Sequence, residues 1–157
     1  MKSCCVIGHR EIEQVENLIK DLKLVISQLI AKKGVRIFYL SSRSEFNEIC
    51  YDVITQLKTE YADIKRIYVR AEYALTNDVY DKHLQKKYED SFYYDDDLKT
   101  GRLSYIKRNE FIINASDFCL FYFNSNYKPQ TNTKSGTAIA YNYALKKSKT
   151  IINFYKN

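Results

Sequence analysis

The sequence contains few of the residues that interrupt secondary structure or cross-link a chain. Only one of its 157 residues is proline and four are glycine, which argues against long flexible linkers. Its two histidines and four cysteines include no Cys-x-x-Cys pair and do not match the spacing of a structural zinc site. No stretch approaches the roughly 18 consecutive apolar residues of a membrane-spanning helix. We therefore expect no metal, no other cofactor and no membrane association.

The cysteines and the N-terminus together indicate a compartment. Cys4, Cys5 and Cys119 fall in apolar runs, which is typical of small, reduced core residues. The first residues contain no signal-like apolar stretch. We therefore expect a cytoplasmic protein.

Length and charge limit the domain count and the partners. Apolar residues make up 45% of the chain and charged residues 28%, as in ordinary globular proteins. A chain of 157 residues is long enough for one core, so we expect a single domain over residues 1–157. The formal net charge is +6, which suits an anionic ligand, but no basic run reaches the length of a nucleic-acid arm. We therefore do not expect nucleic acid as a partner.

Apolar runs alternate with segments of helical spacing along most of the chain. The expected strands are residues 4–7, 35–40, 66–71, 118–123 and 150–155, and the expected main helices are 12–33, 46–57, 103–115 and 135–147. Several strands are continuous apolar runs, as in parallel sheets that are covered on both faces. The pattern predicts an α/β fold, specifically a three-layer Rossmann-like domain with a mainly parallel five-stranded sheet and helices on both faces.

One segment departs from this alternation. Residues 72–102 are rich in Tyr, Asp and Lys and poor in aliphatic residues. Long irregular segments in compact domains are usually functional or disordered. We interpret this segment as an insertion or flap over a site, with room for one short helix between Val79 and Tyr88.

The ends of the expected strands carry candidate binding residues. In parallel sheets of this type, ligands bind beyond the carboxyl ends of the strands, near the reversal of strand order. Arginines follow three of the strands, and a guanidinium group matches phosphate oxygens. A glycine lets the backbone approach a ligand, and His9 offers either a stacking ring or an acid/base group. The candidates are Gly8, His9, Arg10, Ser42, Arg43, Arg70 and Glu72.

The serine-rich loop after the second expected strand has two interpretations. Its hydroxyl groups suit phosphate or ribose. Ser44, followed by Asn47, also makes a good helix N-cap. Both roles are compatible.

A second group of candidates lies near the C-terminus. The segment "TKSGTAIAYNYALKK" follows the apolar run "DFCLFYF" and tightens at Gly136 before a helix begins. A strand, a Ser-Gly-Thr turn and a helix N-terminus together suit a phosphate or ribose. Tight packing alone also explains such a turn. The candidates here are Ser135, Gly136 and Thr137, with Tyr105 as a stacking ring and Arg108 and Asn109 on the preceding helix.

Over most of its length, from "CCVIGHR" to the final "TIINFY", the sequence resembles the SLOG superfamily, which joins the Lonely-guy phosphoribohydrolases, DprA-type proteins and YpsA-like proteins. The similarity is strongest in "YIKRNEFIINASDFCLFYF" and "KSGTAIAYNYALKKSK". Arg108 matches the arginine of the Lonely-guy helix, whereas Asn109 replaces its lysine. Gly136 and Thr137 match the end of the family's glycine loop. Nucleoside deoxyribosyltransferases are similar in the same stretch, and both groups of enzymes carry a glutamate where this chain has Ala140.

The resemblance and the missing glutamate give three functional hypotheses. The first is non-catalytic binding of a nucleotide-derived anionic ligand by a homodimer or higher homo-oligomer. Sensing or sequestration of a nucleotide second messenger of prokaryotic immunity, as in a viral counter-defence sponge, would be such a role. The second is an N-glycosidase, phosphoribohydrolase or deoxyribosyltransferase-like enzyme that uses another carboxylate, namely Glu11, Glu45 or Glu72. The third, ranked last, is a DprA-like single-stranded nucleic-acid binder.

Overall fold

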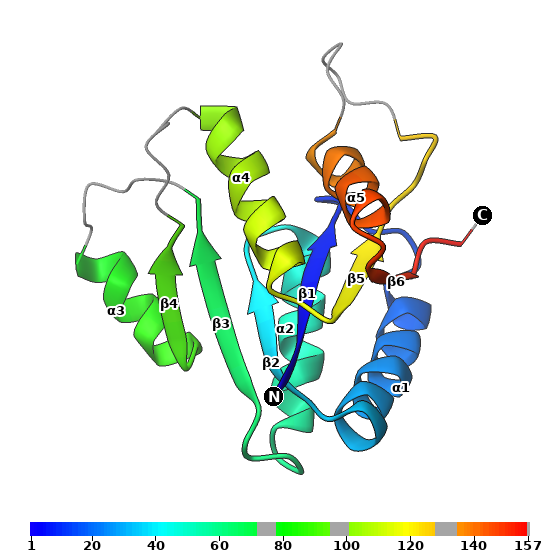
Figure 1. Ribbon diagram of the computed structural model, residues 1–157. Coiled ribbons are helices and arrows are strands. Elements are labelled where there is room, and N and C mark those ends of the chain that lie inside the picture. The colour runs from blue at the N-terminus through cyan, green and yellow to red at the C-terminus, as the bar shows by residue number, and fades with distance from the viewer. Residues whose placement is uncertain (72–77, 95–100, 128–134, 157) are drawn as a thin grey trace.

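A single parallel sheet organises the chain. The computed structural model describes residues 1–71, 78–94, 101–127 and 135–156, apart from the side chains of 78–81 and 101. The sheet has six strands in the order β4-β3-β2-β1-β5-β6 (Figure 1). The strands are β1 (Lys2–Gly8), β2 (Val35–Leu40), β3 (Lys65–Arg70), β4 (Asp90–Tyr93), β5 (Phe118–Tyr122) and β6 (Thr150–Asn153). The helices are α1 (Val15–Lys33), α2 (Glu45–Leu57), α3 (Asp78–Lys87), α4 (Gly101–Asn114) and α5 (Gly136–Lys146).

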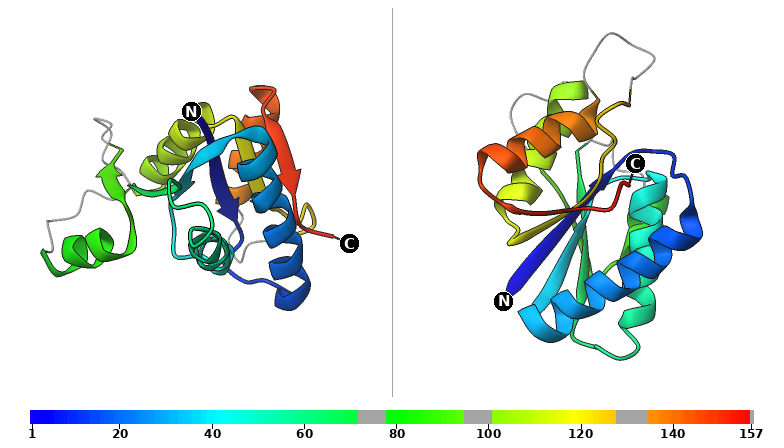
Figure 2. Two further views of the ribbon diagram at one scale, coloured as in Figure 1. Left: turned by 90° about the horizontal axis from the view of Figure 1, so that it is seen from below. Right: turned by 90° about the vertical axis from the view of Figure 1, so that its right-hand side faces the viewer.

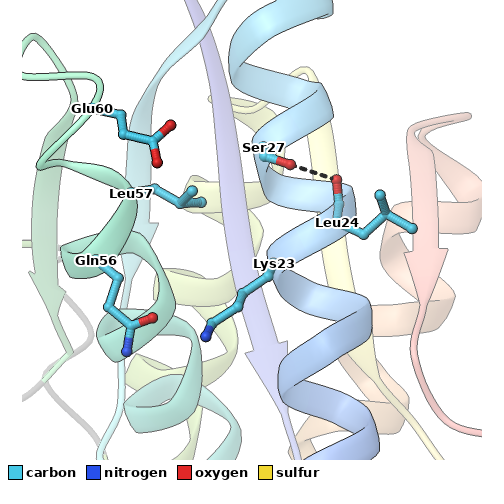
Figure 3. Close-up of a pocket in the computed structure, with 6 residues that line it drawn as sticks. All are labelled: Lys23, Leu24, Ser27, Gln56, Leu57 and Glu60. Carbon is cyan, nitrogen blue, oxygen red and sulfur yellow. Dashed lines mark hydrogen bonds between the residues drawn. The ribbon is translucent and has the colours of Figure 1, made fainter.

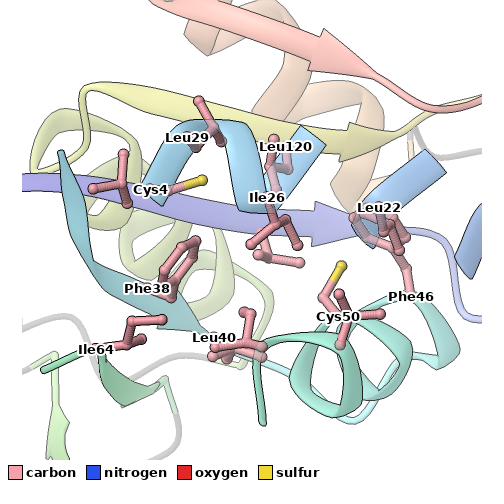
Figure 4. Close-up of a cluster of buried hydrophobic side chains, with 14 of the residues drawn as sticks. Cys4, Leu22, Ile26, Leu29, Phe38, Leu40, Phe46, Cys50, Ile64 and Leu120 are labelled. Carbon is pink, nitrogen blue, oxygen red and sulfur yellow. The ribbon is translucent and has the colours of Figure 1, made fainter. Parts of the chain in front are cut away.

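Helices cover both faces of the sheet. α1 and α2 pack together on one face, and α4 and α5 pack together on the other (Figure 2). The strand period of two divides β1 between two hydrophobic clusters: Cys4 and Val6 face α1 and α2, whereas Cys5 and Ile7 face α4 and α5. Figure 4 shows the first cluster, in which side chains of α1, α2 and the central strands interlock. The expected α/β class and three-layer Rossmann-like arrangement are confirmed.

The expected strand count was one too low. β4 lies within the segment interpreted as a flap, and it pairs in parallel with β3 from Ile67–Asp90 to Arg70–Tyr93. Its sequence, DSFY, contains no aliphatic residue, so it has no apolar run of the kind that indicates a buried strand. The Phe92 ring packs edge-on against Phe111 of α4 and supplies the missing apolar contact. The short helix expected before it is confirmed as α3.

The composition-based expectations for the cysteines are also met. All four cysteines are unpaired and buried, as expected for core residues. Among the described residues, every helix is too short or too polar to cross a membrane.

Gly8 is the last residue of β1 and lies against the first turn of α2. Because glycine has no side chain, there is room for Phe46 of that turn. A Cβ atom on Gly8 would lie 2.7 Å from the Phe46 Cβ and even closer to the ring. Phe46 is fully buried in the first turn of α2. Because the nearest atoms include the Phe46 Cβ, rotation of the ring cannot relieve the clash. Helix packing is therefore a reason for Gly8 that the sequence did not indicate, and its approach to a ligand stays a prediction.

His9 connects β1 to the loop that follows β5. Its Nε2 accepts a hydrogen bond of 2.9 Å from the Asn124 backbone N–H, and its own backbone N–H donates to the Tyr122 carbonyl at 3.3 Å. The side chain is buried, and burial lowers the pKa of His9 from its ordinary value of 6.5. Protonation at Nε2 would convert this acceptor into a donor facing another N–H. The folded state therefore favours neutral His9.

We predict that Gly8→Ala destabilises the protein by about 2 kcal/mol or more, because the added methyl group overpacks a closed contact. Gly136→Ala is the matched control, since a Cβ there meets no atom within 4 Å and its φ is not left-handed. This control should unfold like the wild type or gain up to about 0.5–1 kcal/mol from better helix propensity. Urea unfolding measures both. Equal stability of the Gly8→Ala variant and the wild type would contradict the packing argument.

We predict that part of the stability is lost in mild acid. Because the folded state holds the pKa of His9 below 6.5, its contribution is complete above about pH 7.5 and declines as the pH falls through 6.5. His9→Gln, which does not titrate, should show a smaller decline between pH 8 and pH 5.5 in urea unfolding. His83→Gln, at an exposed position on α3, should retain the wild-type decline. An identical decline in the His9→Gln variant would refute this assignment.

Candidate functional site

The strand order reverses between β1 and β5, which are neighbours in the sheet. The chain steps outward from β1 through β2 and β3 to β4, then returns to the other side of β1 as β5. In such sheets the loops after the two strands at the reversal diverge and leave a crevice at the carboxyl edge. The loop 9–14 follows β1, and 123–127 is the described part of the loop after β5. We call the carboxyl ends of the strands and their loops the strand-end edge; it is uppermost in Figure 1.

The loop after β1 is clamped by the first residue of α2. The Glu45 N–H donates to the Arg10 carbonyl at 3.0 Å, and the Ile12 N–H donates to the Glu45 carboxylate at 3.0 Å. The Arg10 side chain remains exposed. Glu45, one of the carboxylates considered for catalysis, thus has a structural partner. Glu72, another of them and also a candidate binding residue, lies outside the described residues.

The serine-rich loop after β2 is a hydrogen-bonded turn. The Ser44 Oγ accepts from the Asn47 N–H at 3.2 Å, which confirms the expected N-cap of α2. The Ser42 hydroxyl donates to the Ser44 Oγ at 3.0 Å, and the Asn47 side chain accepts from the Ser41 N–H at 3.1 Å. These hydroxyls therefore shape the loop, while the Arg43 side chain is exposed on its surface.

Arg108 joins α4 to the same loop from the opposite face of the sheet. Its guanidinium group donates to the Ser41 carbonyl, and its Nε donates to the Asn109 side chain at 2.9 Å. Arg108 is buried, and its guanidinium carbon lies 5.4 Å from the centre of the Tyr105 ring. Tyr105 itself is 41% exposed. The structure thus brings Tyr105, Arg108 and Asn109 together beside the end of β2.

The candidate arginines differ in burial. Arg70 is buried at the end of β3, with its guanidinium carbon 4.1 Å from the centre of the Tyr93 ring on β4. Arg108 is likewise buried, whereas Arg10 and Arg43 are exposed. Sequence patterns do not separate these two pairs, because all four arginines follow strands or lie on a helix with mixed polarity. Of the four, the exposed pair presents charge directly to solvent.

The Ser-Gly-Thr turn caps α5, and Ala140 lies in the core behind it. The Ser135 Oγ accepts from the Ala138 N–H at 3.0 Å, and Thr137 is buried. Gly136 is exposed, and neither its φ nor its surroundings require glycine. Ala140 is 3% exposed and belongs to the hydrophobic cluster beneath α4 and α5. Tight packing therefore explains the alanine, and a carboxylate at this position would be buried among apolar groups.

The structure adds one feature that the sequence did not indicate. The ring of Tyr127 stacks on the ring of His9, with centroids 4.5 Å apart and planes at 29°. Asn124 anchors this loop, since its carbonyl accepts from the Tyr127 N–H at 3.0 Å and its side chain from the Asn126 N–H at 2.9 Å. The segment "NSNY" carries turn residues, but no local pattern links it to a histidine more than a hundred residues earlier.

A shallow groove lies elsewhere, between α1 and the C-terminal end of α2. Its lining residues are Lys23, Leu24, Ser27, Gln56, Leu57 and Glu60 (Figure 3). None of the candidate residues at the strand-end edge contributes to it. Within the described residues, no three His, Cys, Asp or Glu side chains group as metal ligands would.

The comparisons with known proteins support the fold and change one expectation. No family model and no curated protein matches the chain. Among solved structures, it is similar to DNA processing protein A from Helicobacter pylori, with a TM-score of 0.61 and 17% identity. The match covers 96% of this chain and 63% of that chain, so the chain spans less than two thirds of that protein's length.

That structure was described for its single-stranded DNA binding mode. Our expectation against a nucleic-acid partner is therefore contradicted: a protein with this fold binds single-stranded DNA. The expectation relied on the lack of a basic run in the sequence, but the exposed Arg10 and Arg43 lie on separate loops that follow neighbouring strands. At 17% identity, the likeness establishes the fold that this chain shares with a DNA processing protein A.

Proposed function

We propose that this chain binds single-stranded nucleic acid at the strand-end edge. The observation that carries the proposal is the likeness of 96% of the chain to a protein that binds single-stranded DNA. It also favours the DprA branch of the SLOG resemblance over the enzymatic branches. Because the match covers 63% of that protein, the proposal is limited to the binding of single-stranded nucleic acid.

The charge of the edge suits a phosphate backbone. Arg10 and Arg43 are exposed on the loops after β1 and β2, which are neighbouring strands. Exposed arginines bind phosphate oxygens through paired N–H groups, and the net charge of +6 favours association with a polyanion. This contribution is electrostatic and independent of base sequence.

The rings of the edge suit unpaired bases. Tyr127 is 49% exposed on the loop after β5, and Tyr105 is 41% exposed on α4. Stacking of a base on such a ring contributes about 1–3 kcal/mol and tolerates any base. Bases inside a duplex already stack on each other, so exposed rings favour a single strand. The combination of arginines and rings therefore supports single-stranded rather than double-stranded nucleic acid.

A small nucleotide-derived anion is the second candidate, as a sensor or a sequestering protein would bind. Gly136 favours it, because a glycine that packing does not require leaves open space beside the Ser135 cap. Burial of Ala140 is consistent with binding without cleavage. The comparisons lend no support to a second messenger or to anti-phage defence in particular.

We predict that neutralising the exposed arginines weakens DNA binding more than an equal loss of charge elsewhere. The double variant Arg10→Gln with Arg43→Gln should bind a labelled thymidine oligonucleotide more weakly, and its slope of log affinity against log salt should fall by roughly 0.7 for each phosphate that is no longer neutralised. Fluorescence anisotropy between 50 and 200 mM salt, roughly the range in which such electrostatic interactions dominate, measures both effects. Lys20→Gln with Lys23→Gln on α1 is the matched control, since both lysines are exposed. Equal weakening by both double variants would argue against the strand-end edge.

We predict that Gly136→Ala distinguishes the second candidate. If a small anion binds beside the α5 turn, the added methyl group should lower its affinity without lowering stability. Isothermal calorimetry with nucleoside monophosphates and cyclic dinucleotides tests this with wild type and variant. Absence of heat at millimolar ligand, alongside oligonucleotide binding, would eliminate the small-ligand candidate.

A further inference from the structure

Tyr127 is 49% exposed, and its ring stacks on the ring of His9. The two rings are 4.5 Å apart and nearly parallel, which is the geometry of an aromatic stack. Phe123 lies next to the same histidine, with ring centroids 6.0 Å apart. Tyr127 is thus the outermost ring of a stack that begins in the core and ends at the surface.

The stack lies at the point of the sheet where the strand order reverses. His9 follows β1, and Tyr127 is on the loop after β5, the strand paired directly with β1. Ligands bind in the crevice between these two loops in sheets of this kind. The outer face of such a stack suits a planar ligand group. In a single strand that group is a nucleobase, and any of the bases can stack on an aromatic ring.

We propose that the open face of Tyr127 is a base-stacking subsite of the strand-end edge, and that neutral His9 is the positioning residue that holds it in place. This inference rests on the proposed binding of single-stranded nucleic acid. It goes further in two ways. It assigns the stacking of a base to the Tyr127 ring, and it makes that stacking dependent on the hydrogen bond between His9 and Asn124.

The hydrogen bond explains how His9 acts. Its Nε2 accepts from the Asn124 N–H, and the Asn124 carbonyl accepts from the Tyr127 N–H. Protonation of His9 replaces the accepting lone pair by a second donor, so the Asn124 N–H loses its partner and the loop loses its anchor. Tyr127 then no longer stands at a fixed place beside β1.

The charged and titratable groups around the ring do not replace this contact. On the β5 side they are the phenols of Tyr122 and Tyr127. On the β1 side, Arg10 and Glu11 follow His9 in the chain, Glu45 clamps the same loop, and Glu13, Glu45 and Tyr155 act on the neighbouring Tyr122. Burial lowers the pKa of His9, so the ring is neutral at pH 8 and gains a proton only in mild acid.

The direction in which DNA affinity changes with pH distinguishes a positioning role of His9 from a direct attraction of phosphate by its positive charge. A histidine that only attracts phosphate would strengthen DNA binding as the pH falls, because it becomes cationic. A histidine that positions Tyr127 would weaken binding over the same range. Fluorescence anisotropy with a labelled thymidine oligonucleotide at pH 8, 7, 6 and 5.5 distinguishes the two.

We expect wild-type affinity to fall as the pH drops below about 6.5, the ordinary pKa of histidine. His9→Gln, which keeps a neutral acceptor, should show a weaker dependence, and the exposed His83→Gln should behave as wild type. Tightening of the wild-type complex in acid, or an identical fall in His9→Gln, would overturn the positioning role.

Binding of an abasic oligonucleotide tests whether Tyr127 contacts a base. Tyr127→Ala should weaken binding about tenfold, the loss expected when one base gives up an aromatic partner, while Tyr127→Phe should retain wild-type affinity. The same alanine variant should bind an abasic oligonucleotide as well as the wild type does, because the phosphates are unchanged. Equal loss on both oligonucleotides would show a backbone contact and overturn the base-stacking assignment.

A direct optical reading is available because the chain has no tryptophan. Tyr127→Trp therefore places the sole indole at the proposed subsite, and stacking of a base should quench its fluorescence on DNA addition. Binding by anisotropy without quenching would refute the subsite while leaving the proposed function intact. Absence of wild-type binding at pH 8 would instead refute the proposed function.

Discussion

The contact between Gly8 and Phe46 sets the geometry of the strand-end edge. β1 is one of the two central strands, and its last residue has no side chain, so the first turn of α2 lies directly against the strand. This seat brings Glu45 beside the loop after β1, where it exchanges hydrogen bonds with Arg10 and Ile12. The positions of two strand-end loops therefore depend on one steric fit between a glycine and a buried aromatic ring.

A second set of interactions ties the other face of the sheet to the same edge. Arg108 of α4 donates to the carbonyl at the end of β2, and His9 accepts from the loop after β5. Both side chains are buried, and each makes a hydrogen bond to the backbone of a loop at this edge. They hold in place two loops whose exposed residues, Arg43 and Tyr127, are the ligand contacts that we propose. The edge thus combines buried residues that build it with exposed residues that we propose as the binding residues.

Sequence alone predicted the fold class and most element positions, because apolar runs and helical spacing reflect burial directly. It missed β4, whose contacts to the core come from aromatic rather than aliphatic side chains. For the site, the rule that ligand-binding residues follow strands selected the exposed Arg10 and Arg43, but it also selected the buried Arg70. The sequence cannot separate them, because burial depends on neighbours that are distant in the chain. The stack of His9 on Tyr127 joins residues of different loops and has no local signal.

The proposed function requires single-stranded nucleic acid to bind at the strand-end edge. Photocrosslinking of an oligonucleotide that carries bromouracil, followed by mass spectrometry of the crosslinked peptides, tests occupancy and location together. We expect crosslinks in the peptides that contain Tyr105 and Tyr127, and these crosslinks should be abolished by competition with unlabelled single strand but retained with duplex. Crosslinks confined to the groove of Lys23 and Gln56 between α1 and α2, or none at low salt, would contradict it.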